Sequence, residues 1–181
     1  MAEFQLETER LIMREWRSDD LDAFHAINSD SKVRETLGPI MTRDQVADLI
    51  ARMQKLHEKD GHCFWALDRK SDKRLIGWCG LVRGAQNVPI ADHLEIGWRL
   101  ASDTWGNGYA TEAAKQCIEW ASVQFPDEQI WAITSDNNHR SRSVMERLKM
   151  KYLPERDFDH PGVDPESPLL RHVTYCTERK I

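Results

Sequence analysis

The sequence predicts an α/β domain of the α+β kind, in which helices cover both faces of a mixed, mostly antiparallel sheet. The prediction starts from residues 94–125, where a strand pattern is followed by a glycine-rich turn and a long helix pattern. Other strand and helix patterns alternate along the chain, and no repeat, low-complexity run or linker separates them. Residues 1–181 therefore suit one domain, which could bury about two thirds of its unfolded surface.

The first 41 residues predict a strand, a helix and an irregular segment. Residues 8–17 alternate between apolar and polar side chains, as a strand does. Ser18 is a typical N-cap, and the two acidic residues after it suit the first turn of a helix, which we expect to end near Ser29. Residues 29–41 have no clear period and contain a Gly38-Pro39 break, so we expect a loop there.

Residues 42–82 predict a helix and a hairpin. Thr42 and Gln45 have the spacing of a capping box, and Gly61 supplies a left-handed helix stop. The apolar residues between them recur at helical spacing and form a candidate buried stripe: Val46, Leu49, Ile50, Met53 and Leu56. Two strands are expected at residues 62–68 and 75–82, joined by a polar turn, and a loose segment follows them.

The next pair of elements is the clearest in the chain. Residues 94–100 alternate between large apolar side chains and Glu, Gly or Arg, which predicts a strand. The following helix is predicted from a stripe of small and apolar residues: Ala110, Ala113, Ala114, Cys117, Ile118, Ala121 and Phe125. Pro126 and Asp127 then end the helical pattern.

The C-terminal third completes the expected sheet. Residues 129–135 predict a strand, and a helix opens at Asn138. A strand near Tyr152 and a last strand at residues 170–178 are separated by a proline-rich loop. Counted together, the strand patterns predict a sheet of about seven strands.

The turn between the strand at 94–100 and the long helix is typical of an anion site. Gly106 and Gly108 allow the backbone to approach a ligand, and the helix start offers unpaired N–H groups with the positive end of its dipole. A phosphate group is the ligand that this arrangement favours. A P-loop would need a Gly-Lys-Ser/Thr tripeptide, which does not occur. A dinucleotide fingerprint would need Gly or Ala where Thr111 stands, and a βαβ opening.

One sequence motif reads Glu-Ile-Gly-Trp-x-Leu, followed by Trp-Gly-x-Gly-Tyr-Ala-Thr-Glu-Ala-Ala. It resembles motif A of the GNAT superfamily, in its RimJ/RimL-like branch. The likeness extends from Thr8 to Tyr175. It implies the GNAT fold, with a twisted sheet, and acetyl-CoA (coenzyme A) as the cofactor. It also implies that residues 29–41 border the acceptor pocket. The residues that it assigns to cofactor binding here are Ile96, Gly97, Trp98, Trp105, Gly106, Asn107, Gly108, Tyr109, Ala110 and Thr111.

The resemblance also implies a reaction, which is direct attack of an amine on the thioester. It places the catalytic base at Glu95, and it places polarising backbone amides near Gly97 and Trp98, where the strand would part from its neighbour. The alternative for Glu95 is a solvated strand residue or an ion-pair partner of Arg99. His93, two residues before Glu95, either shares the role of base or is a structural histidine.

A second stretch, Asn138-x-x-Ser141-x-x-Val-Met, resembles motif B of the same superfamily. This implies that Asn138 binds coenzyme A and that Ser141 contacts the cofactor, orients its sulfur or helps to protonate the leaving thiolate. Helix capping is the alternative, since both residue types are common N-caps. Lys149 stands where the family usually has Gly, so a left-handed helix end there would cost about 1 kcal/mol more than with Gly, or the helix runs on.

Composition excludes several function classes. The net charge of −5 argues against a nucleic-acid partner. The N-terminus has no signal-peptide pattern, and no apolar run approaches a membrane span, so we expect a cytoplasmic protein that binds no membrane. The cysteines lack metal-ligand spacing, so we predict no metal and buried thiols at Cys63, Cys79, Cys117 and Cys176. Trp65, Trp78, Trp120 and Trp131 suit the core, while Trp16 and Trp98 suit an acceptor pocket.

The identity of the amine acceptor stays open at this level. Members of the branch act on protein N-terminal amines or on small amines such as polyamines, amino acids or antibiotics. A non-catalytic acyl-CoA sensor is an alternative of a different class, and a dinucleotide-binding enzyme is a remote third. A homodimer is compatible with the branch, although no feature of the sequence requires one.

Overall fold

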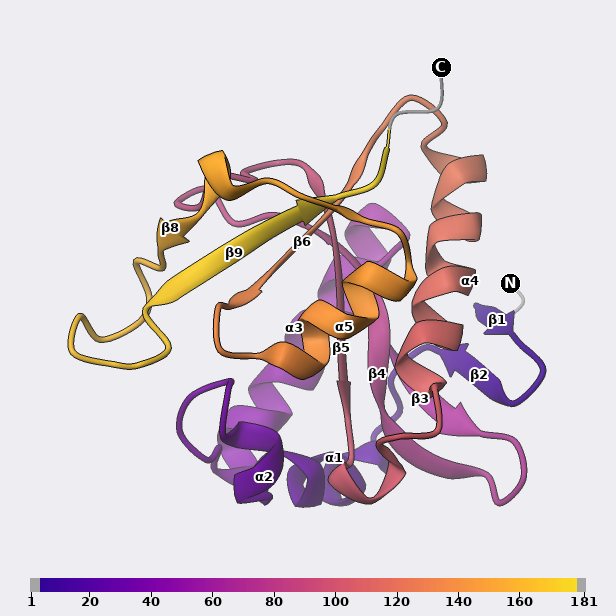
Figure 1. Cartoon of the computed structure of the whole chain (residues 1–181). Helices are drawn as coiled ribbons and strands as arrows, with labels where there is room; N and C mark the ends of the chain where they lie inside the picture. The colour runs from indigo at the N-terminus through magenta and orange to yellow at the C-terminus, as the bar shows by residue number, and fades with distance from the viewer. Residues whose placement is uncertain (1–3, 179–181) are drawn as a thin grey trace.

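The sheet runs through the whole molecule in the computed structural model, which describes residues 4–178 (Figure 1). Its order is β1-β2-β3-β4-β5-β6-β9-β7, with β8 paired to β9. All neighbours are antiparallel except β5 and β6. In chain order the described strands are β1 Gln5–Glu7, β2 Leu11–Arg14, β3 Phe64–Arg69, β4 Arg74–Arg83, β5 Leu94–Leu100, β6 Ile130–Ser135, β7 Lys151–Tyr152, β8 Phe158–Asp159 and β9 Arg171–Cys176.

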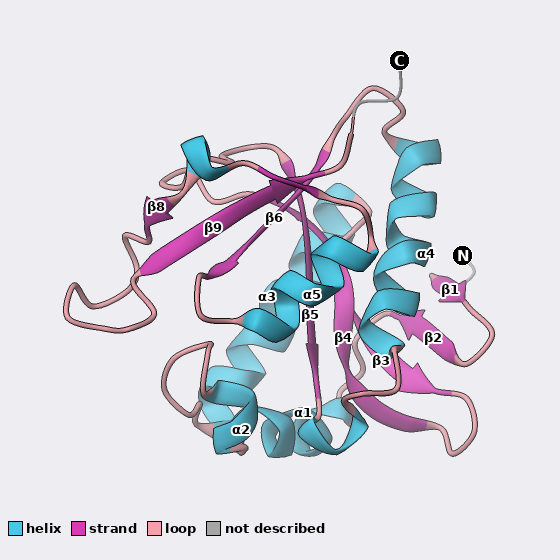
Figure 2. Ribbon diagram, viewed as in Figure 1, coloured by secondary structure: helices cyan, strands magenta, loops and turns pink. Residues whose placement is uncertain are grey.

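Helices cover both faces of the sheet, as predicted (Figure 2). On one face lie α1 (Asp20–Ser29), α2 (Ser31–Arg34) and α3 (Arg43–Asp60), and on the other lie α4 (Tyr109–Gln124) and α5 (His139–Arg147). Two short 3-10 helices, η1 (Ser102–Thr104) and η2 (Pro154–Arg156), interrupt the loops. Within residues 4–178, no helix combines the length and the apolarity needed to cross a bilayer.

The two faces of the central strands meet different helices. Cys79 of β4 lies against Cys117 of α4, with 3.8 Å between the sulfurs. The neighbouring Trp78 points to the opposite face, where Arg99 lies over its ring. The predicted thiols are confirmed, because all four cysteines are buried and free.

The N-terminal strand prediction was wrong in its extent. Residues 8–17 do not form one strand, because Thr8 closes a turn onto Leu11: the two residues exchange hydrogen bonds of 3.0 Å from Thr8 N to Leu11 O and from Leu11 N to Thr8 Oγ1. The turn creates a hairpin of β1 and β2, of which the sequence pattern indicated only the second half. The N-cap of α1 is Asp19 rather than Ser18, and a short helix, α2, occupies part of the expected loop.

The helix and hairpin predicted at residues 42–82 are confirmed. Both hydrogen bonds of the capping box between Thr42 and Gln45 are present, and Gly61 ends α3 with a φ of 74°. In the hairpin that follows, Gly80 lies so close to β3 that a Cβ there would stand 2.1 Å from the carbonyl oxygen of Cys63. No side chain fits at that position.

The strands β5 and β6 part almost as soon as they meet. Their parallel ladder holds two pairs, Leu94 with Ile130 and Glu95 with Trp131. Beyond Glu95, β5 continues along β4 to Leu100, while β6 continues along β9. The sheet therefore opens between the second halves of β5 and β6, with α5 lying over the opening (Figure 1).

The end of α5 shows what Lys149 does in place of the family's usual Gly. Lys149 has a φ of 58°, in the left-handed region. Its N–H donates to Glu146 O at 2.9 Å, and the N–H of Met150 donates to Met145 O at 3.0 Å. These two bonds make a Schellman motif, in which a residue with a Cβ is strained at the left-handed position.

This strain predicts the effect of Lys149→Gly. We expect the variant to raise the free energy of unfolding by about 1 kcal/mol, because glycine enters the left-handed region without steric cost. Urea denaturation of the two proteins measures the difference. Lys149→Ala is the matched control, since it removes the same charge but keeps the Cβ. A gain of equal size in the control would assign the effect to the charge instead.

Candidate functional site

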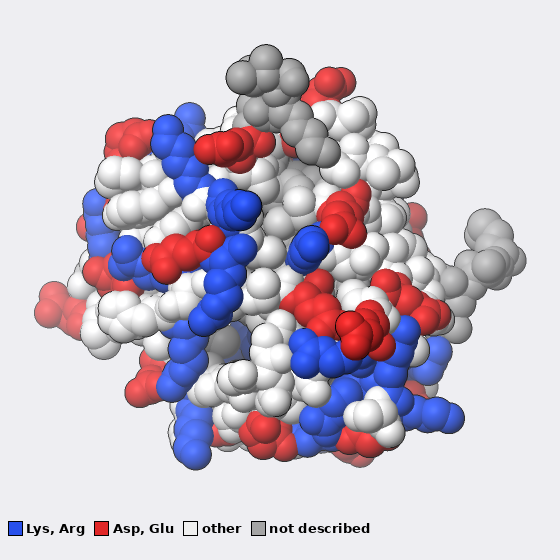
Figure 3. Space-filling view, turned by 45° about the vertical axis from the view of Figure 1, so that its right-hand side comes forward, with Lys and Arg blue, Asp and Glu red and all other residues white. Residues whose placement is uncertain are grey.

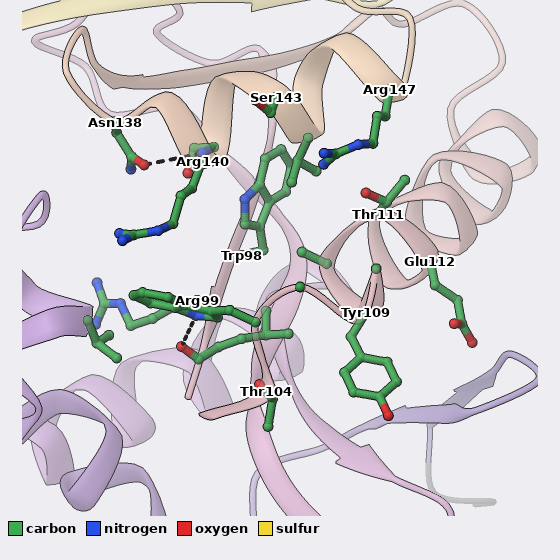
Figure 4. Close-up of a pocket in the computed structure, with 18 of the residues that line it drawn as sticks. Trp98, Arg99, Thr104, Tyr109, Thr111, Glu112, Asn138, Arg140, Ser143 and Arg147 are labelled. Atoms are coloured by element: carbon green, nitrogen blue, oxygen red, sulfur yellow. Dashed lines mark hydrogen bonds between the residues drawn. The ribbon is translucent and has the colours of Figure 1, made fainter. Parts of the chain in front are cut away.

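A cleft of about 820 Å³ opens beside the second half of β5 (Figure 4). Its walls come from β5, from the loop between β5 and α4, from the first turns of α4 and from α5. The remaining wall is the α2 region, which is α2 together with the residues that follow it up to Leu37. The α2 region lies on the opposite face of the sheet from α4 and α5, so the cleft spans the opening between β5 and β6. The residues around it are Val33, Thr36, Leu37, Trp98, Arg99, Leu100, Thr104, Trp105, Gly106, Gly108, Tyr109, Ala110, Thr111, Glu112, Lys115, Asn138, Arg140, Ser141, Ser143, Val144 and Arg147.

The glycine turn forms one end of the cleft. Gly106 and Gly108 have φ values of 80° and 78°, so both need the conformational freedom of glycine. Gly108 is the N-cap of α4 and provides no side chain to bond the helix start. The N–H groups of Tyr109, Ala110 and Thr111 belong to the first helical turn, which has no intrahelical acceptors for them. Because these three residues line the cleft, it meets the positive end of α4.

The acidic residue in this turn is held away from the cleft. The carboxylate of Glu112 forms an ion pair with Arg10 at 2.5 Å and accepts hydrogen bonds from Thr8 Oγ1 and Arg10 N. Burial raises the pKa of Glu112, but these hydrogen bonds outweigh it, so the pKa lies below its ordinary value. The Glu112 charge is therefore neutralised by the β1–β2 hairpin, and Figure 4 shows its carboxylate turned outward.

Two side chains of the turn hold the loop itself. Asn107 Nδ2 donates to the carbonyl oxygens of Thr104 and Trp105 at 3.0 and 3.1 Å, and Asn107 does not line the cleft. Trp105 Nε1 donates to Leu100 O at 3.0 Å, and its ring lies 4.3 Å below the guanidinium of Arg140. Trp105 thus presents an indole face to the cleft, while its polar atom is used inside the loop.

The three predicted residues of β5 differ in their positions. Trp98 lines the cleft on the α4 and α5 face. Ile96 is on the same face but is buried in the core. Gly97 is on the other face, where a Cβ would come within 3.1 Å of the rings of Phe64 and Trp78. Ile96 and Gly97 do not line the cleft, although both lie just beyond the last paired residue of β5 and β6.

On α5, Asn138 and Ser141 are brought together at the cleft. Asn138 Oδ1 accepts from Ser141 N at 3.2 Å, and Asn138 Nδ2 donates to Thr134 Oγ1 at 3.0 Å. Asn138 is therefore the N-cap of α5, as its residue type alone favours. The hydroxyl of Ser141 makes no hydrogen bond to any other residue in the described part of the chain, so it is available to a ligand.

Sequence reasoning missed the basic side of the cleft. Arg140, Ser143 and Arg147 are spaced three and four residues apart on α5 and line the cleft together. Helical periodicity counted from Arg140 could have grouped them on one face of α5. Lys115 of α4 adds another cation. Figure 3, in which the α4 side is turned forward, shows Lys and Arg side chains in a band across this face.

Glu95 lies where β5 and β6 part, on the face that carries α1 and α3. It is half-buried, and desolvation raises its pKa to about 7, while the charge of Arg52 on α3 works in the opposite direction. The alternative of an ion pair with Arg99 is not observed, because Arg99 Nη1 donates to Asn28 Oδ1 instead. A carboxylate with this pKa can take up and release a proton near neutral pH.

Other candidates take structural positions. His93 is exposed and stacks on Trp131, with 4.9 Å between ring centroids. The prediction that Trp16 lines the acceptor pocket was wrong. Its side chain is 5% exposed, and its Nε1 donates to Phe64 O. Trp16 lies in the segment between β2 and α1, and its ring packs against Phe24 of α1. No cluster of His, Cys, Asp or Glu suited to a metal occurs among residues 4–178.

Comparisons with known proteins agree with this architecture. A family model described as "Acetyltransferase (GNAT) domain" matches residues 10–151. The chain is 28% identical to the uncharacterized N-acetyltransferase YoaA of Bacillus subtilis (strain 168) over 152 residues, and this matched segment covers 83% of each of the two chains. A solved acetyltransferase from Agrobacterium tumefaciens has a TM-score of 0.78 at 22% identity, covering 98% of this chain and 96% of that one. RimL, a ribosomal L7/L12 alpha-N-protein acetyltransferase in complex with coenzyme A, has a TM-score of 0.78 at 11% identity, covering 96% and 97%.

The raised pKa of Glu95 predicts a pH dependence of stability. Between its ordinary value of 4.5 and about 7, the folded protein holds a proton that the unfolded chain has released, so the free energy of unfolding falls as pH rises. Glu95→Gln removes this loss. We expect the variant to be more stable than the wild type at pH 8, by on the order of 2 kcal/mol, and equally stable at pH 4. Urea denaturation at the two pH values checks this, and a difference independent of pH would contradict it.

Proposed function

The chain belongs to the acetyltransferase (GNAT) family, and from this premise we propose that it is a RimJ/RimL-like N-acetyltransferase. Its acyl donor is acetyl-CoA and its acceptor is a primary amine, namely a protein N-terminal amine. The observation that carries the proposal is the uncapped N-terminus of α4, which meets the cleft next to the opening between β5 and β6. The likeness of the fold to RimL supports the choice of acceptor.

The residues at the glycine turn fit a pyrophosphate. Anions bind at helix N-termini through backbone N–H groups and the helix dipole. Here the first turn of α4 has no side-chain cap, its acidic residue Glu112 is engaged by Arg10, and Arg140 and Arg147 line the same cleft. The backbone of Gly106, Gly108, Tyr109, Ala110 and Thr111 would hold the phosphates of coenzyme A, while Trp98 and Asn138 would border its arm.

The residues of this chain would then act on a proton and on a leaving sulfur. When bound, acetyl-CoA supplies a thioester carbonyl to the attacking amine. Glu95 takes the proton of the incoming ammonium, directly or through water, because its pKa near 7 leaves a useful fraction ionised at neutral pH. The amides near Gly97 and Trp98, at the opening of the sheet, donate to the carbonyl oxygen. The hydroxyl of Ser141 would donate a hydrogen bond to the cofactor's sulfur.

A small-molecule amine is the second candidate acceptor. The observation that favours it is a contact near the α2 side of the cleft, where Ser135 Oγ at the end of β6 donates to Thr36 O at 3.2 Å. Such a contact ties two elements together beside the cleft, and a compact substrate needs less room there than an extended peptide. A panel that contains both N-terminal peptides and free amines separates these two candidates.

Isothermal titration with acetyl-CoA tests the proposal, with NAD and ATP as controls. Selective binding of acetyl-CoA, followed by thiol release with an amine acceptor, is the expected result. Binding without turnover on any amine would instead identify an acyl-CoA sensor. No binding at millimolar acetyl-CoA would overturn the assignment of the turn.

Gly108→Asp tests the phosphate position at one residue. The added carboxylate stands at the N-terminus of α4, so we expect the affinity for acetyl-CoA to fall below detection through repulsion of the phosphates. Gly108→Asn is the matched control, because Asn tolerates a positive φ about as well as Asp and has a similar size. The control should retain measurable binding. Equal losses in both variants would point to backbone strain rather than charge.

Glu95→Gln tests the base. For the wild type, kcat/KM should rise with pH through about 7, as the carboxylate ionises. The variant should bind acetyl-CoA with unchanged affinity and lose roughly 100-fold in turnover at pH 7. Thiol release across pH 5.5–9 provides the measurement. An unchanged rate and profile would remove Glu95 from the mechanism.

A further inference from the structure

Arg99 is the one β5 residue of the cleft whose side chain lies on the α1 face of the sheet. Its Nη1 donates to Asn28 Oδ1 at 2.5 Å, and its guanidinium lies 5.5 Å from the centre of the Trp78 ring. Its Nε is buried and has no hydrogen-bond partner among residues 4–178. Figure 4 places this side chain at the end of the cleft away from Tyr109 and Glu112.

Among residues 4–178, no acid neutralises this guanidinium. The other charged group beside it is Arg34 of α2, which lowers the pKa of Arg99 further after desolvation has already lowered it, to about 9. Arg34 bonds only to carbonyl oxygens, those of Pro39 and Leu37, at 2.8 and 2.9 Å. Within the described residues, neither Arg99 nor Arg34 forms an ion pair with a carboxylate.

An unpaired guanidinium in a desolvated position raises the free energy of the folded protein, unless a ligand supplies the counter-charge. Arginine with a free edge binds carboxylates through two parallel hydrogen bonds. Here Nε is an unused donor on such an edge, and the Arg99 side chain lines the cleft. The cleft thus offers a site for an oxyanion that is separate from the glycine turn.

We propose that the amine acceptor carries a carboxylate close to its nucleophilic nitrogen, and that Arg99 binds this carboxylate. The inference rests on the proposed acetyltransferase function and specifies its substrate class. Arg99 is two residues beyond Gly97 on the same face of β5, roughly 7 Å along the strand. Glu95, the base, is two residues before Gly97 on that face. One face of β5 therefore presents a group for the acceptor's ammonium and a group for its carboxylate.

The same charges exclude other acceptors. A polyamine would bring a second cation toward Arg99 and Arg34, where like charges in a desolvated site repel strongly. Two sources could supply the carboxylate: the side chain of an N-terminal Asp or Glu in a peptide, or the α-carboxylate of a free amino acid. The chemistry at Arg99 is the same for both.

Matched pairs of acceptors test the proposal. The peptide pair is Asp-Ala-Ala-amide and Asn-Ala-Ala-amide, and the amino-acid pair is alanine and alaninamide. We measure kcat/KM by thiol release, and acceptor affinity by titration in the presence of coenzyme A. The wild type should prefer the carboxylate member of at least one pair by roughly 10- to 100-fold, the range expected for a charge-assisted hydrogen bond. The preferred pair identifies the source.

Arg99→Gln should abolish this preference while leaving the rate with the neutral member within about threefold. Gln keeps a neutral hydrogen-bond donor in the side chain but removes the positive charge. Arg99→Lys, which keeps the charge but not the planar edge, should restore part of the preference. Arg43→Gln, on exposed α3, is the control and should change neither rate nor preference.

The outcomes separate this inference from the proposed function. Turnover with equal rates for both members of both pairs, or a preference for the neutral members, overturns the role of Arg99 and leaves the acetyltransferase intact. Carboxylate-dependent binding that is lost in Arg99→Gln, without any acetyl transfer, would support the site and refute the proposed function. A preference that survives Arg99→Gln would assign the carboxylate to another residue and overturn the inference.

Discussion

The parting of β5 and β6 is the constraint on which the rest of the structure depends. Each strand keeps a complete antiparallel partner, β4 for β5 and β9 for β6, so the sheet tolerates a parallel ladder of only two pairs between them. The opening then needs walls, because exposed strand edges attract other chains. The helix α5 covers it on one face and the α2 region borders it on the other, and the cleft is the space that remains.

The start of α4 depends on contacts far away in the sequence. A helix that begins at a glycine without a side-chain cap leaves its first N–H groups unsatisfied, which costs stability unless a ligand or water pairs with them. The β1–β2 hairpin holds this first turn in place, since Arg10 and Thr8 bind Glu112 and Arg10 lies over the ring of Tyr109. The residues that form the turn and the residues that brace it are thus about 100 positions apart in the sequence; Thr8 and Glu112, for example, are separated by 104 positions.

Glu95 and Arg99 stand on the α1 face of β5, four residues and roughly 13 Å apart along the strand. Glu95 and Arg99 are both desolvated, and burial moves their pKa values toward each other. Gly97 lies between them, covered by Phe64 and Trp78. The two charged groups have separate neighbours, Arg52 for Glu95 and Asn28 for Arg99.

The sequence by itself determined the elements whose signals are local: the capping box at Thr42, the glycine turn before α4 and the alternation of β5. These features depend on residues within a few positions of each other. Only the tertiary structure decided that Trp16 enters the core, that Arg140 and Arg147 border the cleft, and that Arg99 lacks a counter-charge. Such outcomes depend on which faces meet across the sheet, and strand pairing between residues distant in the chain sets those meetings.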